Sequence, residues 1–304
     1  LLAAGGLGGA VLIAAGGSYW IWARYRLPAG RPLAWRRQQL IGHRGCRVGK
    51  PMGSGPPPEN TLEAFKYAHS KGADGFELDT RLTKDGVAVV FHDAHVDRCL
   101  SCSRSQVEVS SLTLDELQQL SFKNAEGVRV PTLEDAVSLA KEHGMKILIE
   151  TKDIHCPAEL AASVVSLIHK YGMLDDALVI SFDPFSLYHV RKLDPEVLTC
   201  FLWCPGLLSY YRSTRLEILP KWWRRFSPVL DLLLFIGAHP ALIPSLLGVS
   251  AIGPEAMFRR KYLKAAWCRG MSTYLWVVND AKLRADVTTL AEDGLIAYST
   301  DDLW

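Results

Sequence analysis

The 304-residue chain has little of what marks several specialised protein classes. Its 7 Cys and 24 Gly are too few for a disulfide-stapled mini-protein or a collagen-like fibre. None of its Asn residues begins an Asn-x-Ser/Thr glycosylation sequon. Neither sign of charge dominates, because 34 Lys and Arg nearly balance 32 Asp and Glu. A net charge of +2 gives no reason to expect a nucleic-acid partner.

The bulk composition is that of a folded protein. Hydrophobic residues make up 49% and charged residues 22% of the chain. A disordered chain would be less hydrophobic and carry more net charge, whereas a polytopic channel would be more apolar. The length allows two average domains, or one α/β barrel of about 250 residues with about 50 residues left over.

The first 23 residues contain no charged side chain. A helix needs roughly 20 apolar residues to cross a bilayer. The run ends in Tyr and Trp followed by Arg24 and Arg26, as at a membrane interface. We expect a transmembrane anchor at 1–23, a basic linker at 24–38 and one folded domain at 39–304. A cleaved signal peptide is the weaker alternative, because no small-residue cleavage site follows the run.

After residue 38, short apolar strands alternate with helical segments. Such alternation predicts a parallel sheet, and eight strand units favour a TIM (β/α)8 barrel. An open doubly wound sheet is less favoured, because no strand is followed by G-x-G-x-x-G. Asp85-Gly86 between two apolar runs predicts a small hairpin, counted here as part of one unit. The predicted strands are 39–43, 75–82, 87–92, 146–150, 177–182, 199–203, 249–252, 273–278 and 295–300; the predicted helices are 60–70, 113–120, 132–143, 158–171, 257–269 and 281–291.

Acidic side chains gather where the predicted strands end, which is the catalytic face of a TIM barrel. Glu77 and Asp79 are two residues apart on one strand, so their side chains point to the same side. Glu150 ends a neighbouring strand unit. Adjacent carboxylates repel one another unless a cation lies between them. Three hard oxygen donors favour Mg²⁺, or alternatively Ca²⁺, over Zn²⁺.

Two histidines and two cations lie at the same predicted strand ends. His43 and His92 can act as acid and base near neutral pH. Arg44 and Lys152 supply positive charge for an anionic substrate. A metal, two histidines and two cations around one cavity are typical of phosphodiester cleavage. Each residue alone has a structural explanation, but their joint placement favours a catalytic role.

Cys99 and Cys102 form an isolated C-x-x-C pair. No second pair follows at zinc-site spacing, so we expect a surface-loop pair, oxidised or reduced, rather than a metal site. The total of 7 Cys is odd, so at least one thiol has no disulfide partner within the chain.

These residues belong to motifs that resemble those of the glycerophosphodiester phosphodiesterases. The resemblance covers roughly residues 39–302, with the motifs in family order. One departure is the ending, where Thr300-Asp301 is present but the following Pro of the family is missing. The Gly- and Pro-rich loop 46–57 is also longer than in most relatives. The motifs are HRG (43–45), PENTLEAF (58–65), GFELD (75–79), KDG (84–86), VVFHD (89–93), VPTLE (130–134), IETK (149–152), SFD (181–183) and WVVN (276–279).

The resemblance implies a TIM barrel with a small insertion after the second strand unit. It also implies hydrolysis of a glycerophosphodiester to glycerol phosphate and an alcohol, either directly or through a cyclic intermediate formed by a substrate hydroxyl. Trp276 and Asn279 are candidate pocket-lining residues. The implied roles are a divalent metal at Glu77, Asp79 and Glu150, acid–base catalysis at His43 and His92, and phosphate contact at Arg44 and Lys152.

The N-terminal run and the stretch 222–266 resemble membrane-anchored animal members of the family. That group acts on glycerophosphoinositol and N-acyl glycerophosphoethanolamines, and regulators of G-protein signalling are linked to it as partners. The resemblance predicts attachment to the plasma membrane or an internal membrane. It slightly favours a catalytic domain on the lumenal or extracellular side, whereas the basic residues after position 23 favour the cytosolic side. Two alternatives are a lysophospholipase D and a non-catalytic membrane scaffold. A scaffold is less favoured because no metal carboxylate or histidine is missing.

The segment 221–252 is a second candidate for membrane contact. It begins with the basic and aromatic run KWWRRF (221–226) and continues into an apolar stretch broken by Asp231, Pro240 and Pro244. These breaks make a spanning helix unfavourable. We expect an amphipathic segment at the membrane surface beside the mouth of the site; a buried barrel helix and a second span are the alternatives.

Trimming this segment should lower hydrolysis of acyl-bearing substrates more than hydrolysis of glycerophosphoinositol, because only the former must leave a bilayer. Rates on both substrates, measured with the same trimmed variant, test this expectation. An equal loss on the two substrates would contradict it.

Overall fold

The computed structural model describes most of the chain. The apolar run 1–23, residues 47–56 and most of 221–252 lie outside the described residues. Among the residues that are described, no helix is both long and apolar enough to cross a membrane. The described residues are 26–35, 37–46, 57–123, 125–153, 155–204, 229, 231, 242–256, 270–290, 295–301 and 303.

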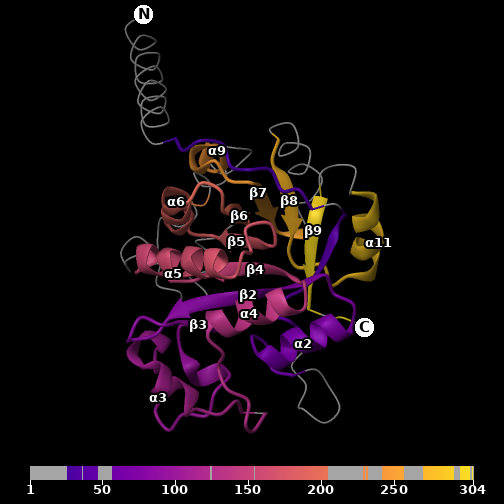
Figure 1. Ribbon diagram of the computed structural model, residues 1–304. Helices are drawn as coiled ribbons and strands as arrows, with labels where there is room; N and C mark the ends of the chain where they lie inside the picture. The colour runs from indigo at the N-terminus through magenta and orange to yellow at the C-terminus, as the bar shows by residue number, and fades with distance from the viewer. Residues whose placement is uncertain are drawn as a thin grey trace, which may run out of the picture.

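Within this part of the chain, nine strands form one sheet, and eight parallel strands of it close into a barrel (Figure 1). The strands are β1 (Gln39–Gly42), β2 (Gly75–Leu82), β3 (Ala88–Val90), β4 (Lys146–Thr151), β5 (Ala177–Ser181), β6 (Leu198–Trp203), β7 (Ala251–Pro254), β8 (Ser272–Leu275) and β9 (Leu295–Thr300). The ring runs β1-β9-β8-β7-β6-β5-β4-β2 and closes where β2 pairs with β1. The end of β2 also pairs with the antiparallel strand β3. The predicted TIM barrel and hairpin are confirmed.

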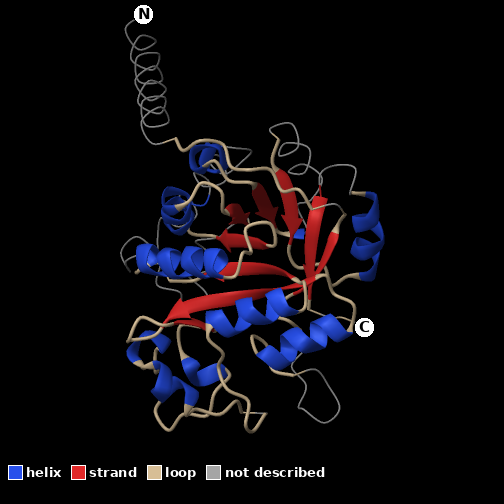
Figure 2. Cartoon of the chain, viewed as in Figure 1, coloured by secondary structure: helices blue, strands red, loops and turns tan. Residues whose placement is uncertain are grey.

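Helices surround the strands on the outside of the barrel (Figure 2). They are α2 (Leu62–Ser70), α3 (Leu114–Gln118), α4 (Leu133–Glu142), α5 (Pro157–Lys170), α6 (Pro184–Leu193), α9 (Leu242–Leu247) and α11 (Ala281–Thr289), with two 3₁₀ turns, η1 (Val96–Arg98) and η2 (Val109–Ser111). The predicted helix 257–269 lies outside the described residues. Helix α6 was not predicted, although Asp183 caps its N-terminus and Pro184 is its first residue, which is a common start signal.

Side-chain caps fix where the helices begin. At α4 the Thr132 hydroxyl accepts a hydrogen bond from the Asp135 amide, and the Asp135 carboxylate accepts one from the Thr132 amide in return. This is a capping box, and it satisfies two amides that no helical carbonyl can reach. The Thr61 side chain caps α2 in a similar way by accepting from Ala64. These caps fix the first residues of α2 and α4.

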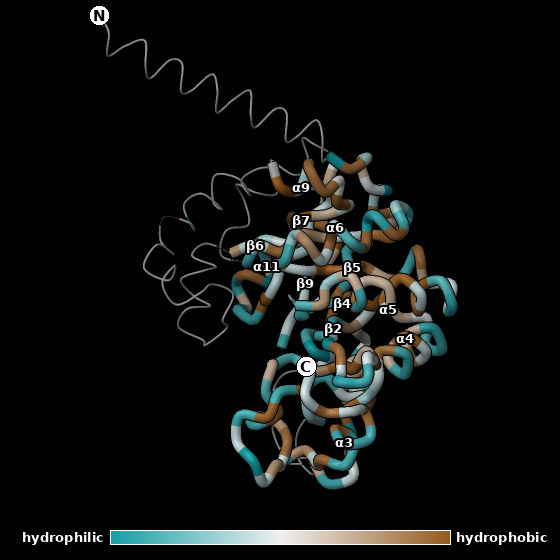
Figure 3. Tube along the Cα trace, turned by 90° about the vertical axis from the view of Figure 1, so that its left-hand side faces the viewer, coloured by the Kyte–Doolittle hydropathy of each residue, from teal (hydrophilic) through white to brown (hydrophobic). Residues whose placement is uncertain are grey.

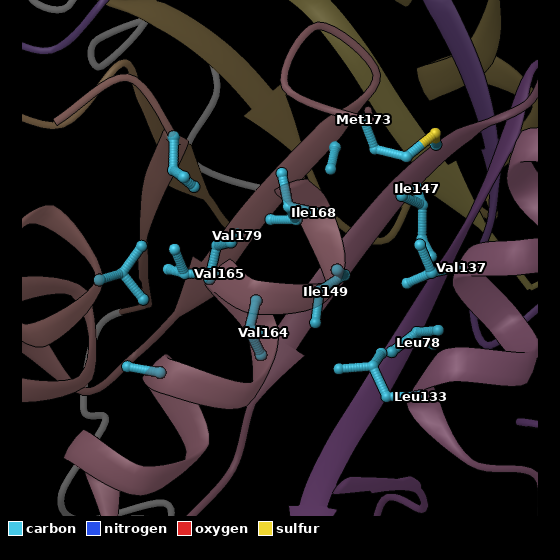
Figure 4. Close-up of a cluster of buried hydrophobic side chains, with 14 of the residues drawn as sticks. Leu78, Leu133, Val137, Ile147, Ile149, Val164, Val165, Ile168, Met173 and Val179 are labelled. Carbon is cyan, nitrogen blue, oxygen red and sulfur yellow. The ribbon is translucent and has the colours of Figure 1, made fainter. Parts of the chain in front are cut away.

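The barrel is packed on both faces of the sheet. Outside, α4 and α5 lie against β2, β4 and β5, so that Leu133 and Val137 pack near Leu78 and Ile147 (Figure 4). Inside, strand residues such as Ile41, Leu148, Leu178 and Cys200 form a second cluster together with Tyr274. The barrel interior is therefore a filled core, as in other TIM barrels, and the space for chemistry lies at the strand ends.

Residues 91–131, between β3 and α4, form an insert with a core of its own, at one end of the molecule around α3 (Figure 3). Val96, Leu100 and Leu117 are fully buried in it. Cys99 and Cys102 lie half-buried in the same insert as free thiols.

Residues 26–35 lie across the amino-terminal end of the barrel. Arg31 pairs with Asp175, just before β5, and the Trp35 indole donates to the Asp175 carbonyl at 2.9 Å. Leu33 packs against the cluster inside the barrel. Arg191 of α6 donates to the Pro28 carbonyl at 2.7 Å. This segment therefore covers the end of the barrel opposite to the carboxyl ends of the strands.

The packing of α2 against β2 should contribute strongly to the stability of the barrel. The rings of Phe65 and Phe76 stack with centroids 4.0 Å apart, and Phe65 is fully buried. Phe65→Ala should lower the free energy of unfolding by about 3–5 kcal/mol, because it opens a cavity at this contact. Phe185 is 69% exposed, so Phe185→Ala should cost no more than about 0.5 kcal/mol. Urea unfolding measures both; similar losses in the two variants would contradict the packing described here.

Candidate active site

The carboxyl ends of the strands bring together the charged residues that the sequence placed there. Asp79 of β2 and Glu150 of β4 are register partners, and Glu77 lies one side-chain repeat earlier on β2. His43 and Arg44 follow β1 directly. Parallel strands with this register place side chains from separate segments within contact distance.

Three buried carboxylates form the centre of the site. Glu77 and Asp79 are each 1% exposed and Glu150 is 7% exposed. One oxygen from each lies within 4.8 Å of the others, and no other group of three or more potential metal ligands occurs among the described residues. Oε1 of Glu77 is buried and accepts no hydrogen bond. An unsatisfied carboxylate oxygen in such a cluster is the donor that a metal ion requires.

The electrostatics of the three carboxylates also fit a cation. Burial, with repulsion from Asp79 and Glu150, raises the pKa of Glu77 well above its usual range. Burial also raises the pKa of Glu150. Burial opposes ionisation of Asp79 as well, but Lys152 and His92 bring its pKa well below its usual value. A divalent cation among these oxygens would favour the ionised form of all three. The donor set suits Mg²⁺ and Ca²⁺ alike.

Two cationic side chains border the carboxylates. Lys152 Nζ lies 2.6 Å from Glu150 Oε1 and 3.1 Å from Asp79 Oδ1. Arg44 Nε lies 3.3 Å from Asp79 Oδ2. Arg44 is 7% exposed and its guanidinium stays charged, because the neighbouring carboxylates raise its pKa against the effect of burial. Both cations are placed to contact an anionic group bound at the carboxylates.

A tight turn after β1 positions His43 and Arg44. Arg44 and Gly45 have φ values of 54° and 78°, in the left-handed region. The Arg44 amide donates to Glu77 Oε2 at 2.9 Å. A side chain on Gly45 would lie 2.8 Å from Ala64, closer than packed atoms allow. The turn therefore requires glycine at this position.

Asn60 connects this turn to the carboxylates. Its side-chain amide donates to Asp79 Oδ2 at 2.8 Å and its side-chain oxygen accepts from the Asp79 amide at 3.2 Å. Its own amide donates to the Arg44 carbonyl at 2.9 Å. Its φ of 59° is one that asparagine tolerates better than most residues. Asn60 lies in the PENTLEAF motif (58–65), but nothing in the local sequence indicates that its side chain will hold Asp79.

His43 is held by an aspartate from the opposite end of the chain. Its Nδ1 lies 2.5 Å from Asp301 Oδ1, and its Nε2 lies 3.9 Å from Glu77 Oε2. Asn279 fixes Asp301 by donating to Oδ2 at 2.6 Å and accepting from the Asp301 amide at 2.9 Å. Burial lowers the pKa of His43. The neutral ring therefore donates from Nδ1 and presents an unprotonated Nε2 to the site.

His92 is also held by a carboxylate at its Nδ1 atom. Its Nδ1 lies 2.5 Å from Asp93 Oδ1. Arg81 donates twice to the His92 carbonyl, at 3.0 and 2.9 Å, and fixes the backbone. Burial lowers the pKa of His92 to about 4. The site thus contains two neutral histidines, each oriented by a carboxylate.

The profile of the Glycerophosphoryl diester phosphodiesterase family matches residues 43–303. The chain belongs to this family. The matched range begins at His43 and includes Asp301, so it contains every site residue described above. The chain is therefore a hydrolase of phosphoric diesters. Its family depends on a divalent metal, and the triad of Glu77, Asp79 and Glu150 offers a set of ligands that could hold one.

Individual relatives agree with the family assignment. Glycerophosphodiester phosphodiesterase 1 of Mus musculus is 31% identical over 253 residues, which is 80% of this chain and 72% of the mouse protein. A glycerophosphodiester phosphodiesterase of Caldanaerobacter subterraneus is 34% identical over 185 residues, or 59% of this chain and 72% of that protein. An Oleispira antarctica phosphodiesterase, solved with its product sn-glycerol-3-phosphate, has the same fold with a TM-score of 0.65 and 23% identity; the match covers 89% of this chain and 96% of that one.

The two candidate pocket-lining residues differ in their contacts. Asn279 holds Asp301 through the nitrogen and the oxygen of its side-chain amide. It therefore positions the carboxylate that contacts His43. Trp276 is half-buried, donates to the Gly253 carbonyl at 2.7 Å and meets Phe182 edge-on at 5.2 Å between ring centroids. Trp276 stays a candidate for lining the mouth.

The raised pKa of Glu77 predicts how metal binding depends on pH. In the metal-free protein, the stability that Glu77 contributes is present in full below its unfolded pKa and is lost as pH rises through its folded pKa. A bound cation opposes that loss. The gain in Tm from Mg²⁺ or Ca²⁺ should therefore grow from about pH 5 to about pH 8. At 100 times Kd the gain is about 2.7 kcal/mol, or about 5–10 °C for a domain of this size.

Thermal unfolding with and without EDTA measures this gain. Glu77→Gln should abolish it, whereas Glu142→Gln at the exposed end of α4 should keep it. A gain that is the same at both pH values, or that survives in Glu77→Gln, would contradict the site.

Proposed function

We propose that this phosphodiesterase hydrolyses glycerophosphodiesters such as glycerophosphoinositol and N-acyl glycerophosphoethanolamine to glycerol phosphate and an alcohol, with His43 and His92 as the acid–base pair. The pair of carboxylate-held histidines beside three buried carboxylates carries this proposal. Mg²⁺ is the favoured metal. The sn-glycerol-3-phosphate bound by the Oleispira antarctica relative supports glycerol phosphate as the product.

The substrate phosphate would lie between the metal carboxylates and the two cations. Lys152 and Arg44 both contact Asp79, so an oxygen of the phosphate placed there meets positive charge from both. Arginine can offer two parallel N–H donors to a phosphate, which fixes its orientation as well as its position. When bound, a divalent cation polarises the phosphoryl oxygens.

The two histidines would carry out the proton transfers. One accepts a proton at Nε2 from the attacking water, or from a glycerol hydroxyl if a cyclic intermediate forms. The other donates a proton to the oxygen of the leaving alcohol. Both histidines have lowered pKa values before substrate binds. The negative charge of the phosphate raises the pKa of the histidine nearest the leaving oxygen, which can then carry the proton it donates.

Two other functions make different predictions in the same assay. A lysophospholipase D would prefer lysophospholipids to glycerophosphodiesters without an acyl chain. A scaffold at the membrane would turn over neither substrate. The intact set of carboxylates and histidines favours an enzyme, and the attachment to a membrane through residues 1–23 stays a prediction.

Hydrolysis of glycerophosphoinositol with Mg²⁺, Ca²⁺ or EDTA tests the proposal. EDTA should abolish turnover, and His43→Gln or His92→Gln should lower kcat about 10²–10⁴-fold, because each removes a proton-transfer group. His143→Gln at the exposed end of α4 is the matched control and should keep full activity. Turnover in EDTA, or full activity in either site variant, would refute the assignment.

A further inference from the structure

We propose that Arg98 is a positioning residue that ties the insert 91–131 to the catalytic machinery, an inference that rests on the proposed phosphodiesterase function. Arg98 ends η1 on the barrel side of the insert. Its Nη2 lies 2.5 Å from Glu59 Oε1 and its Nε lies 2.5 Å from Asp93 Oδ2. One guanidinium therefore bridges two carboxylates from separate segments of the chain.

Each of these carboxylates holds a residue of the proposed mechanism. Glu59 Oε1 also accepts from Arg44 Nη1 at 3.0 Å, and Arg44 is the proposed phosphate contact. Asp93 accepts from His92 Nδ1 at 2.5 Å. The result is a continuous chain of ion pairs from Arg44 through Glu59 and Arg98 to Asp93, which holds the neutral ring of His92.

The geometry of the bridge determines the orientation of Asp93. Arg98 Nε faces Oδ2 at 2.5 Å, while Nη2 faces Oδ1 at 3.2 Å, so the two donors grip both oxygens. Such a fork fixes the plane of a carboxylate, which a single contact does not. The Asp93 plane in turn fixes the ring of His92 and its tautomer. Arg98 would therefore hold His92 through Asp93 without contacting the reacting atoms.

The insert supplies a rigid base for this side chain. Val96 and Leu100, on either side of Arg98, are fully buried in the core of the insert. The Val96 amide donates to the Val107 carbonyl at 2.9 Å, and the Lys123 amide donates to the Cys99 carbonyl at 3.0 Å. The Arg98 side chain itself is 48% exposed. Its replacement should therefore remove the bridge without opening the core.

The test compares Arg98→Met with Arg37→Met in the wild-type background. Arg37 forms an exposed ion pair with Asp74 at the amino-terminal end of the barrel, so it is a control of matched size and charge. Arg98→Met should lower kcat for glycerophosphoinositol about 10- to 100-fold, because a His92 ring that is no longer held in one orientation transfers its proton less efficiently. KM should rise, because Glu59 loses its Arg98 partner and then holds Arg44 less firmly. Arg37→Met should change neither.

A double-mutant cycle with Asp93→Asn separates positioning from a general structural effect. If Arg98 acts through Asp93, the double variant should have about the kcat of Asp93→Asn alone. Separately, ¹⁵N NMR of labelled histidines, assigned with His92→Gln, should show one tautomer of His92 in the wild type and both in Arg98→Met. An unchanged kcat in Arg98→Met, kcat losses that multiply, or an unchanged tautomer would overturn the inference. An inactive wild type would instead refute the proposed function.

Discussion

Three carboxylates that share one buried site set the strongest constraint on this molecule. Glu77, Asp79 and Glu150 lie within 4.8 Å of one another with almost no solvent. Neighbouring charges of the same sign in such a place raise their own pKa values unless cations balance them. Lys152 and Arg44 supply part of that balance, and a divalent metal at the triad would supply the remainder. The excess of negative charge would attract the metal, and the cations that balance it would attract the phosphate.

Barrel closure is what completes the site. The pairing of β1 with β9 places Gly42 opposite Thr300, so the residues that follow the two strands, His43 and Asp301, meet at the same rim. The other histidine receives its partner locally, from Asp93. One histidine therefore depends on the global fold and the other on the insert beside it.

The barrel strands and the shared side of Glu77 and Asp79 could be predicted from local sequence, because alternation along a strand places both side chains on one side without knowledge of the fold. The Asp301 partner of His43 could not be found in the same way, since 258 residues separate the two and only barrel closure joins them. The Glu59–Arg98 bridge likewise depends on how the insert packs. Asn279 was expected to line the pocket, but a side-chain amide in a loop carries no local sign that it will hold a carboxylate. The start of helix α6, by contrast, does have a local signal, since Asp183 caps the helix and Pro184 is its first residue.

A crystal structure with Mn²⁺ and glycerol 3-phosphate tests the central claim most directly. Anomalous scattering should place one metal among the oxygens of Glu77, Asp79 and Glu150, at about 2.0–2.6 Å from each. The phosphate should lie against Lys152 and Arg44 at the same metal. A metal bound elsewhere, or a phosphate away from these two cations, would contradict the site described here.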